Sequence, residues 1–207
     1  YFSAKARTLI TGYPTRQELG TWDRSQAREK LNLRSDLPVL LVSGGSKGAR
    51  SINRALFGAL PGLLSTVQVL HISGTLDWAE VEIAKASLPA ELASNYHAYS
   101  YLHEEMGAAF ASADLTICRA GASTLGELPL FGLPAILVPY PYAWRYQRVN
   151  ASYLVEKGAA QMITDDLLAE QLLPTVQTLL QNPGKLAEMR RAMQSLSHPQ
   201  AAQHLAE

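Results

Sequence analysis

The chain has 207 residues, and its 18 basic and 18 acidic side chains give a formal net charge of zero. This length suits one α/β domain with a full core. The balanced charge argues against a protein that binds nucleic acid through net positive charge. The single cysteine, Cys118, excludes a disulfide within the chain, and no uninterrupted apolar run of about 18 residues predicts a transmembrane helix. The first ten residues lack the apolar core of a signal peptide, and they resemble a segment from within a domain. We expect a cytoplasmic location.

Short apolar runs alternate with longer helical patterns along the chain. We predict strands at 7–11, 38–43, 67–73, 96–101, 114–118, 134–139 and 159–164. Helices are expected between them at 24–33, 49–64, 77–88, 104–113, 123–132 and 146–158, and after the last strand near 166–181, 183–196 and 199–206. Several strands are almost continuously apolar, which is typical of a parallel sheet covered on both faces. The pattern therefore predicts one doubly wound, Rossmann-like α/β domain over residues 1–207.

Loops of unusual composition follow five of the predicted strands. They are residues 11–16, 44–48, 101–104, 119–124 and 140–142. Ligands of open parallel sheets bind outside the carboxyl ends of the strands. We therefore expect these five loops to converge on one binding site.

The segment LLVSGGSKGARSIN, residues 40–53, takes a buried strand through a glycine-rich turn into a helix. Glycines let a ligand approach the backbone, and the free amides of a helix N-terminus attract phosphate. The alternative is a tight turn in which Ser46 is the helix N-cap. Three glycines around Ser46 and Lys47 favour a phosphate site. The spacing matches neither a Walker loop nor the dinucleotide fingerprint, which disfavours P-loop and nicotinamide chemistry.

Gly121 again stands where a strand becomes a helix. Thr124 and Glu127 have the spacing of a capping box, in which Glu127 would bond the N-cap amide. Alternatively, Glu127 faces the site and accepts two hydrogen bonds from a vicinal diol such as that of ribose. The spacing alone leaves both interpretations open.

A loop rich in proline and tyrosine leads into the helix expected from Tyr146. Gln147 and Asn150 lie three residues apart and share one helix face. Paired amides suit sugar hydroxyls, which need both donors and acceptors, but the spacing alone favours an ordinary polar helix surface. No histidine spacing predicts a metal site, and no nucleophile motif is present in the sequence. We expect no cofactor.

The segments TGYPTR, LLVSGGSKGARSIN, YLHEEMGAAFASADLTICRAGASTLGELPLFGLPAILVPY and YQRVNASYLVEKGAA together resemble the C-terminal half of the MurG family of glycosyltransferases, in glycosyltransferase family 28. The likeness runs from about Ala4 to the end of the chain. It implies half of a GT-B fold, in which the C-terminal domain binds the donor UDP-GlcNAc without a metal. It also implies transfer of GlcNAc to undecaprenyl-pyrophosphoryl-MurNAc-pentapeptide (lipid I), which yields lipid II in peptidoglycan synthesis.

The resemblance assigns donor contacts position by position. Arg16 and Ser46 are expected near the pyrophosphate, and the backbone of Leu102 is expected at the uracil edge. Glu127 is expected on the ribose, and Gln147 and Asn150 on the sugar. Gly45 and Gly121 belong to the loops that approach the donor.

Three positions depart from the family pattern. Lys47 stands where glutamine is frequent, which puts an extra positive charge near the phosphates. Tyr146 replaces the first of two paired glutamines, so one sugar contact differs from the family pattern. Tyr142 stands where many relatives have histidine.

The family's acceptor loops and proposed catalytic base belong to an N-terminal domain, for which no matching segment is found here. We therefore expect no catalytic residue in this chain and donor binding without transfer. The resemblance implies a lipid I acceptor held by the N-terminal domain, no nucleic acid, and peripheral association of the intact enzyme with the inner face of the cell membrane. Alternatives are the donor domain of another UDP-sugar enzyme, a UDP-GlcNAc epimerase, or a non-catalytic nucleotide-binding module.

Overall fold

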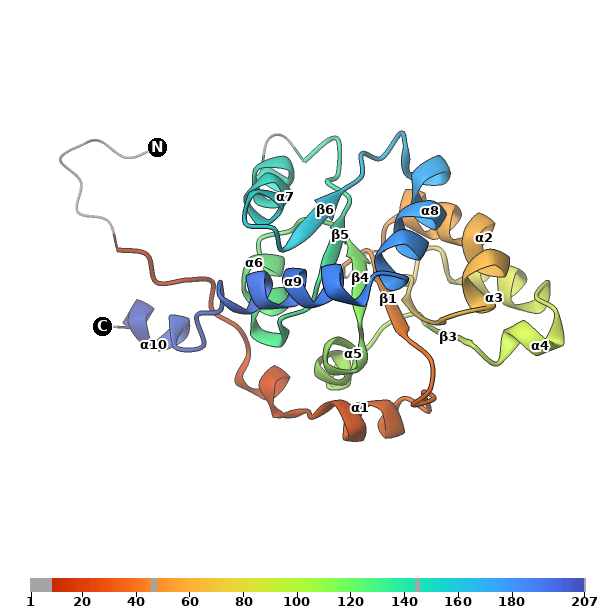
Figure 1. Cartoon of the computed structure of the whole chain (residues 1–207), viewed down its shortest axis with the longest axis horizontal. Helices are drawn as coiled ribbons and strands as arrows, with labels where there is room; N and C mark the ends of the chain where they lie inside the picture. The colour runs from red at the N-terminus through yellow and green to blue at the C-terminus, as the bar shows by residue number, and fades with distance from the viewer. Residues whose placement is uncertain (1–8, 46–47, 144–145, 207) are drawn as a thin grey trace.

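The fold is a six-stranded parallel sheet with helices on both faces (Figure 1). The computed structural model describes residues 9–45, 48–143 and 146–206. The strands are β1 (Val39–Ser43), β2 (Gln68–Ile72), β3 (Tyr96–Tyr99), β4 (Leu115–Cys118), β5 (Ala135–Leu137) and β6 (Ala160–Met162). Their spatial order is β3-β2-β1-β4-β5-β6, the order of doubly wound nucleotide-binding domains. The predicted fold class is confirmed.

Two helical segments precede the first strand, and the others lie between strands or follow the last one. They are η1 (Gln17–Thr21), α1 (Arg24–Lys30), α2 (Arg50–Leu64), α3 (Trp78–Ala86), α4 (Ala90–Ala93), α5 (Met106–Ser112), α6 (Thr124–Phe131), α7 (Tyr146–Glu156), α8 (Leu168–Leu180), α9 (Pro183–Gln194) and α10 (Ala201–Ala206). Each predicted helix is found, whereas the short η1 and α4 were not predicted. Both are too short to show a helical period in the sequence.

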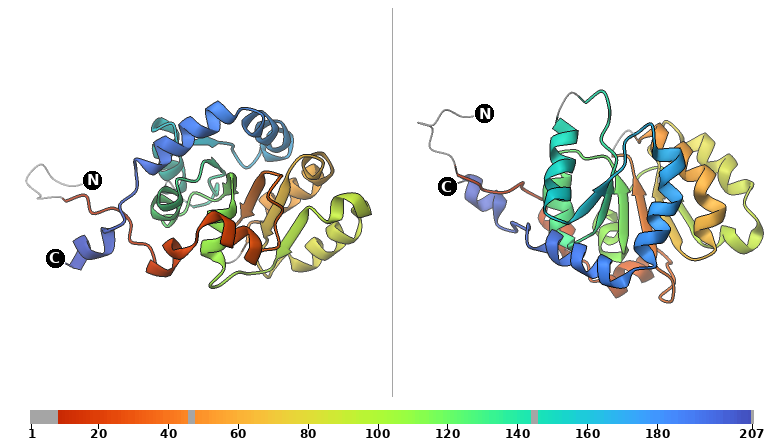
Figure 2. Two further views of the ribbon diagram at one scale, coloured as in Figure 1. Left: turned by 60° about the horizontal axis from the view of Figure 1, so that its bottom comes forward. Right: turned by 45° about the horizontal axis from the view of Figure 1, so that its top comes forward.

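Side chains of successive strand residues enter two separate core layers. Val39 and Leu41 of β1 pack into the layer that α1, α5, α6 and α7 complete. Leu40 and Val42 pack into the layer formed with α2, α3 and α8. Figure 2 shows the helices that cover the two faces of the sheet. Because both faces are buried, every β1 residue before Ser43 had to be apolar, which explains the continuous hydrophobic run.

Helix α9 joins the two layers. Its Met193 is buried in the first layer and its Met189 in the second. Its N-cap, Asn182, accepts a hydrogen bond from the Lys185 amide at 3.0 Å, and Pro183 occupies the first helical position. The helix therefore covers an edge where the two layers meet.

The predicted strand at 7–11 is wrong at the residues that the structure describes, 9–11. Leu9 and Ile10 are 80% and 87% exposed and pair with no strand. Residues 13–15 instead lie against α6, since a Cβ on Gly126 would stand 2.7 Å from the Tyr13 carbonyl oxygen. A strand needs a neighbour for its ladder, and residues 9–11 are not part of the described sheet.

The first and last described segments lie side by side away from the sheet (Figures 1 and 2). Gly12, at φ +84°, packs against His198, which precedes α10. Across the residues that the structure describes, none of the helices has the length and apolar character needed to cross a bilayer.

Candidate functional site

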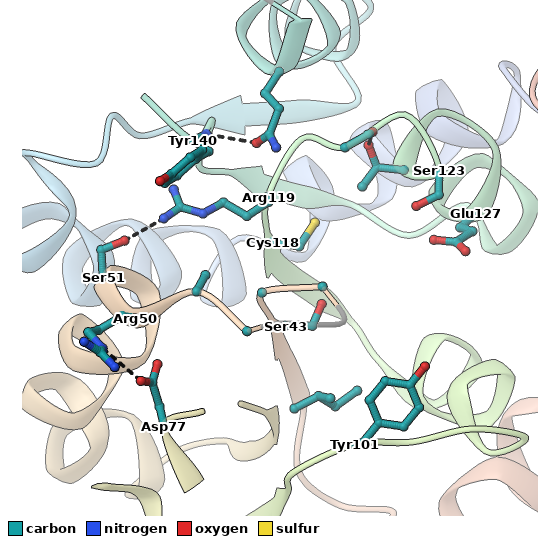
Figure 3. A pocket seen from close by; sticks show the side chains of 18 of the residues that line it. Ser43, Arg50, Ser51, Asp77, Tyr101, Cys118, Arg119, Ser123, Glu127 and Tyr140 are labelled. Atoms are coloured by element: carbon teal, nitrogen blue, oxygen red, sulfur yellow. Dashed lines mark hydrogen bonds and ion pairs between the residues drawn. The ribbon is translucent and has the colours of Figure 1, made fainter. Parts of the chain in front are cut away.

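A cleft of about 1240 Å³ opens at the carboxyl ends of the strands. It extends across the boundary between β1 and β4, where the chain connections diverge to opposite faces of the sheet. Residues that follow β1, β2, β3, β4 and β5 line it (Figure 3). Arg16 lines it as well. The predicted convergence of the loops is confirmed. Arg16 reaches the cleft from the segment before η1 rather than from the end of a strand.

The glycine-rich turn at the end of β1 is built on two left-handed glycines. Gly45 has φ +81° and Gly48 φ +76°, and the Gly48 amide donates to the Gly45 carbonyl at 2.9 Å. A Cβ on Gly48 would stand 2.1 Å from the Ser73 carbonyl oxygen, so no larger residue fits. Ser46 and Lys47 lie outside the described residues.

Helix α2 starts directly after this turn. Its N-cap position falls on Ala49, which has no side-chain capping bond, so the alternative that made Ser46 the N-cap is wrong. The first turn of a 15-residue helix thus points its amides and the positive end of its dipole at the cleft. This is the geometry that binds phosphate.

Glu127 faces the cleft and forms no capping box. The N-cap of α6 is Ser123, which leaves Thr124 as the first helical residue, and the Thr124 hydroxyl donates to the Gly121 carbonyl. The capping interpretation of Thr124 and Glu127 is therefore wrong. Glu127 is half-buried in the cleft wall, and burial raises the pKa of its carboxyl. A hydrogen bond from Ser123 and the positive charge of Arg16 oppose that rise.

Two further predicted residues line the same cleft. Leu102 is 8% exposed and follows β3, so its backbone is held at the cleft wall by a buried side chain. Gly121 follows β4, and no atom lies within 4 Å of the position where its Cβ would be. A ligand can approach the Gly121 backbone directly.

The amides of Gln147 and Asn150 both point at loops that follow strands. Gln147 Oε1 accepts from the Tyr140 amide at 2.9 Å, which leaves the Gln147 NH₂ group as a donor in the cleft. Asn150 Nδ2 donates to the Ala120 carbonyl at 3.0 Å and so holds the loop after β4. Asn150 is not among the cleft-lining residues, and neither is Tyr146, which is 66% exposed.

Sequence reasoning missed a charged cluster at one end of the cleft. Arg119, directly after β4, donates to Asp165 and to the Val138 carbonyl, and it donates to the Ser51 hydroxyl at 2.7 Å. Ser51 in turn donates to Asp165 at 2.8 Å. The Tyr140 ring lies 5.3 Å from the Arg119 guanidinium carbon. Arg119 lies in loop 119–124, which was predicted to line the site, although its ion pair was not predicted. Asp165 follows β6, so the strand-end rule could have found it as well. No sequence signal marks Ser51.

A second polar chain, also missed, ties α2 to β2. Asn53 Nδ2 donates to the Asp77 carboxylate at 2.9 Å and to the Ser73 carbonyl at 3.0 Å. Asn53 Oδ1 can only accept, so His71 Nε2 must carry the proton at 2.9 Å, and His71 Nδ1 accepts from the Tyr96 hydroxyl at 2.7 Å. Burial lowers the pKa of His71 to about 3, so the ring is neutral.

Within the described ranges, no group of three or more His, Cys, Asp or Glu side chains is placed to hold an ion. Cys118 is fully buried, and burial raises the pKa of its thiol to about 12. The thiol therefore stays protonated and behaves as a small apolar residue.

The sheet order and the cleft at its switch point define a doubly wound α/β domain whose candidate ligand site lies outside the strand ends. Residues 39–205 match the family model described as "Glycosyltransferase family 28 C-terminal domain", and the chain belongs to this family.

Curated relatives of the chain include several proteins named UDP-N-acetylglucosamine–N-acetylmuramyl-(pentapeptide) pyrophosphoryl-undecaprenol N-acetylglucosamine transferase. The protein of that name from Roseiflexus sp. (strain RS-1) is 43% identical over 220 residues, covering 97% of this chain and 50% of the relative. That from Desulforudis audaxviator (strain MP104C) is 41% identical, covering 97% and 55%. The chain thus spans about half the length of the curated relatives it matches.

Solved structures agree with the fold. The crystal structure of Acinetobacter baumannii MurG superposes with a TM-score of 0.73 and 31% identity, covering 93% of this chain and 56% of that one. A UDP-GlcNAc 2-epimerase from Neisseria meningitidis, bound to UDP-GlcNAc, gives a TM-score of 0.62 at 10% identity. At that identity the likeness concerns the fold alone.

Proposed function

We propose that this chain is the UDP-GlcNAc-binding half of a glycosyltransferase that transfers GlcNAc to lipid I in peptidoglycan synthesis. The names of relatives that are 39–43% identical support the donor and the acceptor. The observation that carries the proposal is the cleft itself, in which the open N-terminus of α2 and the Glu127 carboxylate line one cavity. Those two features match the phosphates and the ribose of a nucleoside diphosphate.

The remaining cleft residues fit the same ligand. Arg16 supplies a cation at the cleft, the Leu102 backbone is available to a base, and the Gln147 NH₂ group is available to sugar hydroxyls. Gly45 and Gly121 allow close approach of the ligand to the backbone. Asn150 serves the site through Ala120, whose loop it holds.

The proposed reaction is an inverting displacement. A hydroxyl oxygen of the acceptor sugar bonds to the anomeric carbon of GlcNAc, and the bond from that carbon to the diphosphate oxygen breaks. The hydroxyl proton passes to a base outside this chain, and UDP leaves with the electron pair. The N-terminus of α2 and the Arg16 guanidinium offset the negative charge that develops on the leaving group.

We further propose that the whole protein works in the cytoplasm as a peripheral protein at the inner face of the cell membrane. The support is chemical, because an acceptor linked to undecaprenol is anchored in lipid. Partition of the whole protein between buffer and vesicles that contain the acceptor tests this proposal.

Calorimetry of the chain with UDP, UDP-GlcNAc, UDP-glucose and NAD tests donor binding. We expect saturable binding of UDP and UDP-GlcNAc, weaker binding of UDP-glucose and far weaker binding of NAD. Equal affinity for several UDP-sugars would point to the donor domain of another UDP-sugar enzyme. Absence of UDP binding would overturn the proposal.

A further inference from the structure

Arg119 is fixed at the same end of the cleft as the first turn of α2. Its side chain is 11% exposed, yet it lines the cleft, and its Nη2 lies 2.7 Å from the hydroxyl of Ser51, the second residue of that helix. The Tyr140 ring covers the guanidinium from the other side (Figure 3). A buried cation therefore stands next to the helix terminus that attracts phosphate.

The charge of Arg119 is cancelled where it stands. Asp165 accepts from Arg119 and from Ser51, so one carboxylate ties the end of β6 to both α2 and the loop after β4. The Asp165 side chain is 24% exposed, so solvent screens this pair less than a surface pair.

Two other arginines that line the cleft also form ion pairs with carboxylates. Arg50 pairs with Asp77 at 2.9 Å, and Arg54 pairs with Glu80 at 3.3 Å. Among the cleft-lining arginines that the structure describes, Arg16 alone makes no ion pair. Four described arginines therefore line the cleft, and three of them form ion pairs with carboxylates.

We propose that Asp165 is a positioning residue that restrains Arg119 and cancels its charge at the phosphate end of the cleft, so that UDP is bound loosely enough to leave after transfer. This inference rests on the proposed function, since it presupposes that the cleft binds UDP. It follows from Coulomb's law, because an uncompensated cation beside the α2 terminus would add attraction for each negative charge of the diphosphate. Uridine, which lacks phosphate, would gain nothing.

The test compares affinities for UDP and uridine by calorimetry in four proteins: wild type, Asp165→Asn, Arg119→Met and the double variant. In Asp165→Asn the uridine-to-UDP ratio of Kd values should rise about fivefold, with a steeper salt dependence of UDP binding. Arg119→Met leaves Asp165 uncompensated and should lower the ratio. The double variant restores neutrality and should return the ratio to that of wild type.

Two controls separate charge from structure. Asp36→Asn removes the partner of Arg34, in an exposed pair outside the cleft, and should leave the ratio unchanged. Asp165→Glu keeps the charge and should keep the wild-type ratio. If Asp165→Asn does not fold, the inference is tested by the other two variants. The uridine-to-UDP ratio of Kd values should fall in Arg119→Met and return to the wild-type value in the double variant.

An unchanged or lower ratio in a folded Asp165→Asn protein overturns the inference, as does a gain that persists in the double variant. If wild type binds UDP and the ratio does not respond, the inference alone fails. If wild type does not bind UDP, the proposed function fails with it.

Discussion

The role of Glu127 depends on which residue is the N-cap of helix α6. With Ser123 as N-cap, Glu127 lies one residue beyond the capping-box position, so it does not cap the helix. Its carboxylate then lines the cleft, where burial raises its pKa and the Ser123 hydrogen bond and Arg16 partly compensate. A carboxylate held in this way has lone pairs for both hydroxyls of a ribose.

We predict that Glu127→Gln weakens UDP binding by about 1.5–3 kcal/mol, because a charge-assisted hydrogen-bond pair to the diol is lost. Calorimetry measures the loss, with 2′,3′-dideoxy-UDP as the ligand control. The variant should bind UDP and the dideoxy analogue with nearly equal affinity. If it discriminates between them as well as wild type does, Glu127 does not touch the ribose. Thermal unfolding should change little, since burial disfavours the charge that is removed.

His71 gives a prediction about pH. Its pKa in the folded chain, about 3, lies below the ordinary value of 6.5, so the unfolded chain binds the proton more readily. Stability is then complete above about pH 6.5 and falls by up to about 1.4 kcal/mol per unit as the pH drops toward 3.

The matched variant is His71→Gln, which cannot titrate. We expect it to be about 1–3 kcal/mol less stable than wild type at pH 7, because a buried hydrogen bond is lost. The stability difference between the two proteins should shrink at pH 5. Urea unfolding at both pH values measures this, and a constant difference would contradict a neutral, buried His71.

The elements of the fold follow from the sequence where burial alone decides them. All six strands lie within the predicted runs. The four central strands, β1, β2, β4 and β5, are mostly apolar because both of their faces are buried, whereas the edge strands β3 and β6 are only partly buried. The run at 7–11 is similarly apolar, but its described residues, 9–11, pair with no strand, and the sequence does not reveal a missing partner. The Arg119–Asp165–Ser51 cluster was not predicted either, because its contacts depend on tertiary structure. Ser51 and Asp165 are 114 positions apart in the sequence.

The glycine-rich turn and α2 offer a test at the scale of one element. Gly48→Ala should destabilise the chain by about 2 kcal/mol or more, because φ is +76° and the new Cβ would meet the Ser73 carbonyl oxygen at 2.1 Å. Gly58→Ala is the matched control within α2, where no atom lies within 4 Å of the new Cβ. It should stabilise the chain by about 0.5–1 kcal/mol. Urea midpoints that shift equally for both would refute the close approach of Gly48 to β2.

At the scale of the whole molecule, each carboxylate among the described residues that line the cleft already has a polar partner within the chain. Asp77 is engaged by Arg50 and Asn53, Asp165 by Arg119, and Glu127 by Ser123. No histidine is among the described residues that line the cleft. The His103 ring instead packs on Tyr101, with ring centroids 4.4 Å apart.

We therefore predict that these 207 residues bind UDP-GlcNAc saturably but transfer no measurable GlcNAc to a lipid I analogue. Rate depends on positioning the acceptor against the anomeric carbon and on a group that takes its proton, and donor binding supplies neither. A radiolabelled donor and thin-layer separation of the lipid product measure transfer. Adding the other half of the length found in the curated relatives should produce turnover with the same UDP affinity. If the chain alone forms lipid II and His103→Ala abolishes the activity, the base lies in this chain and the assignment of this domain to donor binding alone is wrong.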